Sequence, residues 1–121
     1  MRYMLLCYHD EQAWEKAGET ALQQAMEEAV QRAQQLKASG QYVMAAPLHS
    51  TSMATSVRMR EGKRLVTDGP FAETREVLGG FYLIDARDLD EAIDIAARTP
   101  GARLGSVEIR PLMEIAGLPT G

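Results

Sequence analysis

Residues 67–84 read T-D-G-P-F-A-E-T-R-E-V-L-G-G-F-Y-L-I and hold the turn and the strand that decide the fold. In the triplet Asp68-Gly69-Pro70, an aspartate can accept hydrogen bonds from downstream backbone amides, a glycine permits a positive φ, and a proline fixes the next φ. The triplet therefore predicts a tight turn. The apolar stretch at 77–84 is typical of a strand near the sheet centre, with glycines at its start and aromatic residues in its middle.

The segments on either side of this strand predict a regular order of elements. Thr20 with Gln23 forms a capping-box pattern at the start of a long helix, and Asp88 with Glu91 forms one at the start of a second helix. Helical spacing of apolar residues supports both helices, and the predicted apolar stripe of the second consists of Leu89, Ala92, Ile93 and Ala96. Alternating or continuous apolar runs support the strands. The predicted strands cover residues 2–8, 41–46, 54–60, 63–67, 77–84 and 106–115, the predicted helices cover 20–37 and 88–98, and a short helical turn capped by Asp10 covers 10–14.

Two β-α-β units with a hairpin inserted between them define the expected architecture. It is an α+β, ferredoxin-like split βαβ fold, with an antiparallel sheet and two helices on one face. The segment 81–84 is apolar on both sides, so the face without helices also needs cover. A second copy of the chain is the simplest cover, and we therefore expect a homodimer.

The composition argues against several classes of protein. A chain of 121 residues, 45% hydrophobic and 25% charged, fits one domain, which we expect at 1–115 with a loose C-terminal tail at 116–121. Its net charge of −4 argues against general binding to nucleic acid or membranes, and no apolar stretch has the length of a membrane span or the pattern of a signal peptide. The single cysteine, Cys7, lies in an apolar run, so we expect a small buried thiol in a cytoplasmic protein.

The charged residues after the turn allow a catalytic or a structural interpretation. Glu73 and Glu76 are spaced as in one turn of a helix, so they could share a face for acid–base chemistry or for a divalent cation. The same carboxylates could be a solvated patch, or could join Arg75 and Asp68 in ion pairs that hold the loop. The residues alone leave both interpretations open.

Two histidines and the last strand supply further candidates. His9 and His49 lie at or just after predicted strand ends, where functional sites gather, although a surface or capping role is the plainer interpretation. Glu108 and Arg110 share one face of the last strand, where the arginine could hold an anionic group or pair across strands. No zinc-ligand spacing, phosphate-binding glycine loop or nucleophile elbow occurs, so we expect no metal and no cofactor.

The stretch V-T-D-G-P-F-A-E-T-R-E-V-L-G-G-F-Y-L-I-D (66–85) closely resembles the signature of the DGPF-domain proteins, a branch of the YCII-related family. The likeness covers nearly the whole chain. R-Y-M-L-L-C-Y-H-D-E looks like the first strand of the family, A-T-S-V-R-M-R-E-G-K (54–63) like its hairpin, and D-L-D-E-A-I-D-I-A-A-R-T-P followed by G-S-V-E-I-R-P-L like its second half. Arg75 stands where lysine is usual, and His9 stands where glycine is common, so a role of His9 would be specific to this protein.

The resemblance implies a dimeric α+β barrel and leaves the activity open. Related YCII proteins have a His–Asp pair proposed as an active site in a cleft, and some members of the wider group act on small ring compounds. The histidine of that pair lies in the first helix, where this chain has none. DGPF proteins are often encoded beside, or fused to, alternative sigma factors, which implies a sensing or regulatory role.

Three hypotheses of function follow. The first, which we favour, is a small-molecule-binding or regulatory module linked to a sigma-factor system. The second is an enzyme in which Asp68 and His49 exchange protons with a small molecule. The third is a structural dimer whose D-G-P-F loop only builds the interface. The candidate ligand-binding residues are Gly69, Pro70, Phe71, Glu73 and Arg110.

Overall fold

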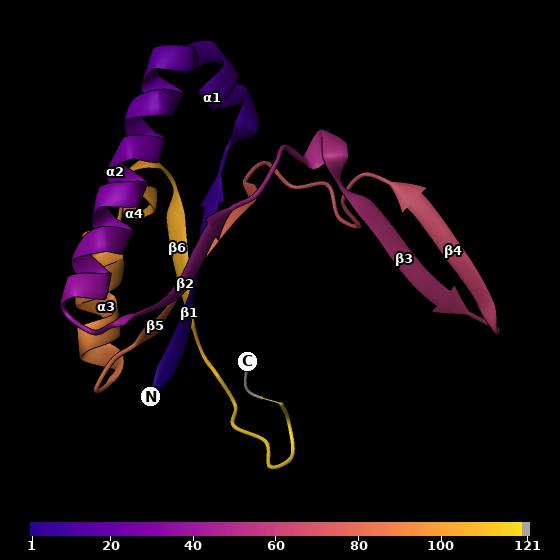
Figure 1. The fold of residues 1–121 in the computed structure, drawn as a ribbon. Helices are drawn as coiled ribbons and strands as arrows, with labels where there is room; N and C mark the ends of the chain where they lie inside the picture. Colours follow the sequence, from indigo (N-terminus) through magenta and orange to yellow (C-terminus); the bar gives the residue numbers. More distant parts are fainter. Residues whose placement is uncertain (120–121) are drawn as a thin grey trace.

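In this computed structural model, which describes residues 1–119, the elements follow the predicted order (Figure 1). The strands are β1 (Arg2–His9), β2 (Tyr42–Pro47), β3 (Thr55–Arg60), β4 (Lys63–Asp68), β5 (Val77–Asp85) and β6 (Ser106–Pro111). The helices are α1 (Glu11–Ala17), α2 (Glu19–Ala38), α3 (Leu89–Ala97) and α4 (Pro100–Leu104), with a short 3-10 helix, η1 (Thr51–Met53).

The main sheet has four antiparallel strands in the order β2-β5-β1-β6, which is the arrangement of the ferredoxin-like fold. All four α-helices lie on one side of this sheet (Figure 1). Strands β3 and β4 form a separate two-stranded sheet, the inserted hairpin. The prediction of an α+β split βαβ fold with an inserted hairpin is therefore confirmed.

The core lies between the sheet and the helices. Because successive strand residues point to opposite faces, Tyr3 and Leu5 of β1 and Tyr82 and Ile84 of β5 all face the helices, and all four are buried. The helical side of this cluster consists of Leu36, Ala92, Ile95 and Ala96.

The apolar face of α3 differs from the predicted one. Ala92, Ile95 and Ala96 are buried, whereas Leu89 and Ile93, which the helical spacing had placed in the stripe, are 51% and 48% exposed. The two alanines let α3 lie close to its neighbours, so the helix presents its small residues to the core.

Helix starts follow local capping chemistry, with one exception. The Asp10 carboxylate accepts hydrogen bonds from the amides of Gln12 and Ala13, and the Asp88 carboxylate accepts one from Glu91 at 2.9 Å. Both caps were predicted. The predicted cap at Thr20 is wrong, because Gly18 has a φ of 92° and lets the chain pass directly from α1 into α2, which begins at Glu19.

Two prolines change the predicted C-terminal elements. Pro100 was expected only to end α3, but it occupies the first turn of a further helix, α4, where its missing N–H costs nothing. β6 ends at Pro111 rather than at 115, because proline has no N–H to continue the ladder. The predicted loose tail at 116–121 includes residues 120–121, which lie outside the described residues.

The face of the sheet opposite the helices is apolar and uncovered. Pairing places Met44 of β2, Leu83 of β5 and Met4 of β1 side by side on this face, with Arg110 of β6 beside Met4. Met44 is 52% exposed. Within residues 1–119, no helix is long and apolar enough to cross a membrane.

The β3–β4 hairpin projects from the body on the side of the sheet away from the helices (Figure 1). Its turn has positive φ at Glu61 (50°) and Gly62 (75°), which suits the twist of the flanking strands and confirms the predicted turn. Val57 and Val66 pair across the hairpin and remain 60% and 55% exposed. The hairpin therefore buries little apolar surface of its own.

Helix α2 is anchored to the core at its C-terminal end only. Leu36 is 1% exposed, whereas Met26 and Val30, further toward the N-terminus, are 43% and 56% exposed. The residues of α2 that face the sheet between them are largely alanines, which are too short to fill the space below the helix. This half of α2 therefore forms the roof of a cavity.

Replacing the buried Leu36 should lower the free energy of unfolding much more than replacing Met26, a residue of similar size above the cavity. We expect Leu36→Ala to lower the free energy of unfolding by about 2–5 kcal/mol, because it leaves a void in a packed core. Met26→Ala should cost less than about 1.5 kcal/mol, since that side chain is already half exposed. Urea unfolding monitored by circular dichroism gives both values, and equal losses would contradict an anchor at one end.

Candidate functional site

An apolar cavity of about 490 Å³ lies between the N-terminal half of α2 and the sheet. Its roof is the α2 face that includes Leu22, Met26 and Val30, and its floor consists of strands β2 and β5. The end of β1, helix α1 and helix α4 line the remaining sides. Further lining residues are Ala25, Ala29, Ala33, Tyr42, Ala45, Pro47, Gly80, Phe81, Tyr82, Pro100, Gly101 and Leu104.

His9 and Trp14 form one wall of this cavity. The Asp10 cap starts α1 directly after β1, which places the Trp14 ring edge-on to the His9 ring with 6.2 Å between their centroids. The His9 ring lies against Gly79, where any Cβ would overlap the imidazole. Gly79 is therefore needed for close approach: it leaves room for a histidine at the end of β1.

The loop after β2 is tied to the same corner. The Glu11 carboxylate accepts hydrogen bonds from the backbone amide of Thr51, at 3.2 Å, and from the Thr51 hydroxyl. Partial burial acts to raise the pKa of Glu11, but these bonds, together with a bond from Ser50 and the nearby His9, lower it below the ordinary value. Glu11 is thus a fixed negative charge behind His9, outside the cavity lining.

The cavity wall itself carries no negative charge at neutral pH. Burial raises the pKa of the Cys7 thiol to about 11 and the pKa of the Tyr82 phenol to about 12, so both groups stay protonated. Among residues 1–119, no aspartate or glutamate lines the cavity, whereas His9 and Lys37 do. The arrangement suits a molecule with an apolar body and a group that accepts hydrogen bonds.

The D-G-P-F segment lies at the base of the hairpin, away from this cavity. Asp68 ends β4, and Pro70, Phe71 and Glu73 follow it as exposed residues. The expected bonds from downstream amides to Asp68 are absent within residues 1–119. The turn is held instead by backbone of Gly69, whose N–H donates to the Ala54 carbonyl at 2.7 Å and whose carbonyl accepts from the Ser56 hydroxyl, also at 2.7 Å. The φ of 94° at Gly69 turns the chain back toward β3 and so brings the Gly69 N–H and carbonyl within reach of these two partners.

The other predicted site residues also lie outside the cavity. His49 is exposed in the loop between β2 and η1, and Arg110 is exposed on β6, on the uncovered face of the sheet. None of Asp68, Glu73, His49 and Arg110 lines this cavity. Roles for these residues stay predictions.

The carboxylate pair that the spacing of Glu73 and Glu76 allowed is not formed. The segment that holds Glu73 and Glu76 is not helical, so the two side chains do not share a helix face. Glu76 accepts a hydrogen bond from the Ser106 hydroxyl at 3.0 Å, and Arg75 pairs with Asp10 at 3.5 Å instead of with Asp68. These contacts attach the loop to β6 and to the start of α1. Within residues 1–119, no group of three or more histidine, cysteine, aspartate or glutamate side chains could hold a metal ion.

The cavity was missed from sequence because its signal is a pattern of small residues. Alanines recur at 25, 29 and 33 on the sheet-facing side of α2, and glycines occupy 79 and 80 on the floor. Alanine and glycine are common in helices and strands, so they did not stand out, although each leaves space unfilled between two layers. A helix face with alanine at every fourth position, above a strand with paired glycines, was the available sign.

Two comparisons with known proteins match nearly the whole chain. The profile of the YCII-related domain matches residues 1–116. An uncharacterized protein, R00369, from Rhizobium meliloti (strain 1021) is 43% identical over 117 residues, which cover 93% of this chain and 92% of the relative. The family match confirms the predicted resemblance to the YCII-related family, whereas the narrower DGPF branch stays a prediction.

The burial of Cys7 in the cavity wall should make it slow to alkylate. A pKa raised from 9.0 to about 11 lowers the thiolate fraction at pH 8, so we expect iodoacetamide to react about 100-fold more slowly than with the urea-unfolded chain. The native rate should keep rising with pH toward 11, whereas the unfolded rate should level off above pH 9. Mass spectrometry of the alkylated chain gives both rates, and equal rates at pH 8 would contradict a desolvated thiol.

Proposed function

The chain belongs to the YCII-related family, and we propose that it is a small-molecule-binding protein whose ligand occupies the apolar cavity under α2. The observation that carries this proposal is the cavity itself. Its volume of about 490 Å³ falls in the range of ligand pockets, about 300–1,000 Å³, and its walls are apolar with a few polar groups.

The exposed apolar residues of α2 support the same proposal. Leu22, Met26 and Val30 line the cavity and are 42%, 43% and 56% exposed. Leaving such side chains half exposed loses hydrophobic stabilisation, which a bound apolar ligand would recover by removing them from water. We therefore expect ligand binding to stabilise the folded chain.

The polar groups of the wall indicate how a ligand would be oriented. Trp14 offers an aromatic surface, and His9 and Lys37 offer hydrogen-bond donors. Because Cys7 and Tyr82 stay protonated, neither repels an acceptor group on the ligand. The proposed ligand class is a small molecule with an aromatic or aliphatic body and one acceptor group.

Binding without turnover is the form of this function that the cavity supports best. Within residues 1–119, the lining holds the imidazole of His9 but no carboxylate or thiolate beside it to complete an acid–base pair at neutral pH. Asp68 and His49, the acid–base pair of the enzyme hypothesis, lie outside it. The link to a sigma-factor system stays a prediction from the resemblance, and a ligand-dependent change in a dimer would be a suitable signal for it.

We also propose that two copies pack through the uncovered faces of their sheets. The apolar row Met44, Leu83 and Met4 and the projecting hairpin lie on the side away from the helices (Figure 1). A two-stranded hairpin is marginally stable alone and gains most from packing against another surface. A second copy offers the matching apolar face and a hairpin of its own, as in other two-fold symmetric dimers.

Filling the cavity should abolish ligand binding. N-phenyl-1-naphthylamine is a neutral, aromatic probe, and we expect it to fluoresce on binding and to quench Trp14, the only tryptophan of the chain. Ala33→Phe places a ring in the cavity and should weaken binding at least about tenfold, a loss of about 1.4 kcal/mol or more.

The matched control adds the same ring outside the cavity. Gln31 is an exposed residue of α2 that does not line the cavity, so Gln31→Phe should leave the affinity unchanged within about twofold. Equal affinity in wild type, Ala33→Phe and Gln31→Phe would show that the probe binds elsewhere, and would refute the proposed site.

The dimer should depend on the uncovered face. We expect light scattering at micromolar concentration to give the mass of two chains for wild type, and Met44→Glu to shift this mass toward one chain by burying a charge in the interface. Ile93→Glu is the control, because Ile93 is similarly exposed, at 48%, but lies on α3 on the other side of the sheet. A monomeric wild type would count directly against this arrangement.

A further inference from the structure

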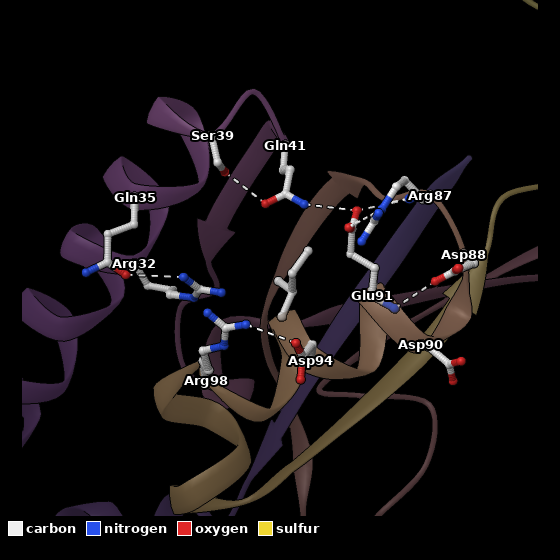
Figure 2. A pocket seen from close by; sticks show the side chains of 11 residues that line it. Arg32, Gln35, Ser39, Gln41, Arg87, Asp88, Asp90, Glu91, Asp94 and Arg98 are labelled. Carbon is white, nitrogen blue, oxygen red and sulfur yellow. Dashed lines mark hydrogen bonds and ion pairs between the residues drawn. The ribbon is translucent and has the colours of Figure 1, made fainter.

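A second cavity, of about 740 Å³, is a polar groove between the C-terminal half of α2 and α3 (Figure 2). Arg32, Gln35 and Ser39 line it from the side of α2, and Asp94 and Arg98 line it from the side of α3. The groove lies on the flank of α2 away from Met26 and Val30, so it is separate from the apolar cavity.

Arg32 in this groove has an unmet hydrogen-bond donor. Its Nε is buried and has no hydrogen-bond partner among the described residues. Its Nη1 donates to Gln35 Oε1 at 3.2 Å, which is a bond to a neutral group. Within residues 1–119, no carboxylate lies within ion-pair distance of Arg32. A buried donor without a partner costs free energy, and such a group in a native protein calls for an explanation.

A second guanidinium faces the first one. Arg32 and Arg98 point toward each other across the groove (Figure 2). Burial lowers the pKa of Arg32, and the positive charge of Arg98 lowers it further, which shows that the two cations repel. Arg98 is paired with Asp94 at 3.0 Å, but both side chains are more than 60% exposed, so this ion pair offsets little of the repulsion.

The other charges of the groove are already paired or distant. Arg87 binds Glu91 at 2.7 Å, and Gln41 donates to the same carboxylate at 3.0 Å. Asp88 caps α3, and Asp90 points away from the arginines at the far end of the groove (Figure 2). Among the arginines that line the groove, Arg32 is therefore the one without a carboxylate partner within residues 1–119, and it faces Arg98 at this end.

We propose that a small oxyanion, a phosphate or carboxylate group, binds between Arg32 and Arg98. An anion there would accept hydrogen bonds from the guanidinium of Arg32, whose Nε lacks a partner, and screen the two guanidinium groups from each other. Guanidinium presents parallel N–H donors whose geometry matches the oxygens of phosphate and carboxylate. The acidic residues at the other end of the groove repel a second anionic group, so the site favours a ligand with one anionic end.

Titration with inorganic phosphate at constant ionic strength tests this site directly. We expect calorimetry to give a saturable dissociation constant of about 1 mM, typical of a weak ligand. In a ¹⁵N–¹H spectrum of arginine side chains, the Arg32 Nε–H signal should shift along the same curve. A parallel acetate titration separates a site for phosphate groups from one for carboxylates, and saturable binding of either anion supports the proposal.

Four arginine variants test the site, and Arg87→Gln is the control within the same groove. Arg32→Gln and Arg98→Gln should each weaken anion binding at least about tenfold, whereas Arg87→Gln, at the acidic end, should change it less than about twofold. Arg32→Lys keeps the charge without the planar donors, and should bind at an intermediate level.

Two results would overturn the proposal. The first is no saturable binding of phosphate or acetate up to about 50 mM, because a water molecule would then suffice as the partner of the orphan donor. The second is equal weakening in Arg87→Gln and Arg32→Gln, because the effect would then reflect net charge alone. Circular dichroism of each variant confirms that the loss is not one of folding.

Discussion

The packing of Leu36 in the core is the contact on which the position of α2 above the sheet depends. It holds the C-terminal end of α2 in the core formed by Tyr3, Leu5 and Ile84, while the rest of the helix contacts the sheet through short side chains. The apolar cavity results from this one-ended attachment, whereas the polar groove lies beside the anchored end of α2. On one flank the helix covers the apolar cavity, and on the other it presents Arg32 to the polar groove. A helix packed evenly along its length would leave no room for the apolar cavity.

Small residues decide where space remains in this fold. Gly79 accommodates the His9 ring, and at Gly80 an added Cβ would lie 3.0 Å from the Ala46 carbonyl, so β2 and β5 approach closely there. The alanines of α2 remove volume on the opposite side of the same space. The stretch 66–85 therefore contributes to the proposed site through its second half, where β5 forms the cavity floor, and not through the D-G-P-F turn.

Local chemistry made much of the fold predictable. The caps at Asp10 and Asp88, the hairpin turn at Glu61-Gly62 and the order of elements were all inferred correctly from short stretches of sequence. The errors arose where two local signals competed. Gly18 ended one helix and began the next, so the capping box at Thr20 was not used, and Pro100 began α4 instead of only ending α3. In each case the backbone conformation of one residue outweighed a side-chain pattern.

The sequence alone determined the family, the α+β class, the strand and helix order and the absence of a zinc or phosphate-loop motif, because these follow from motifs and periodicities along the chain. Only the tertiary structure decided which residues face a common space. His9 and Trp14 meet because α1 follows β1 without a linker, and Arg32 meets Arg98 because α2 and α3 lie side by side on the sheet. Such meetings depend on the distance between packed layers. That distance is set by the sum of many side-chain volumes, which no short stretch of sequence contains.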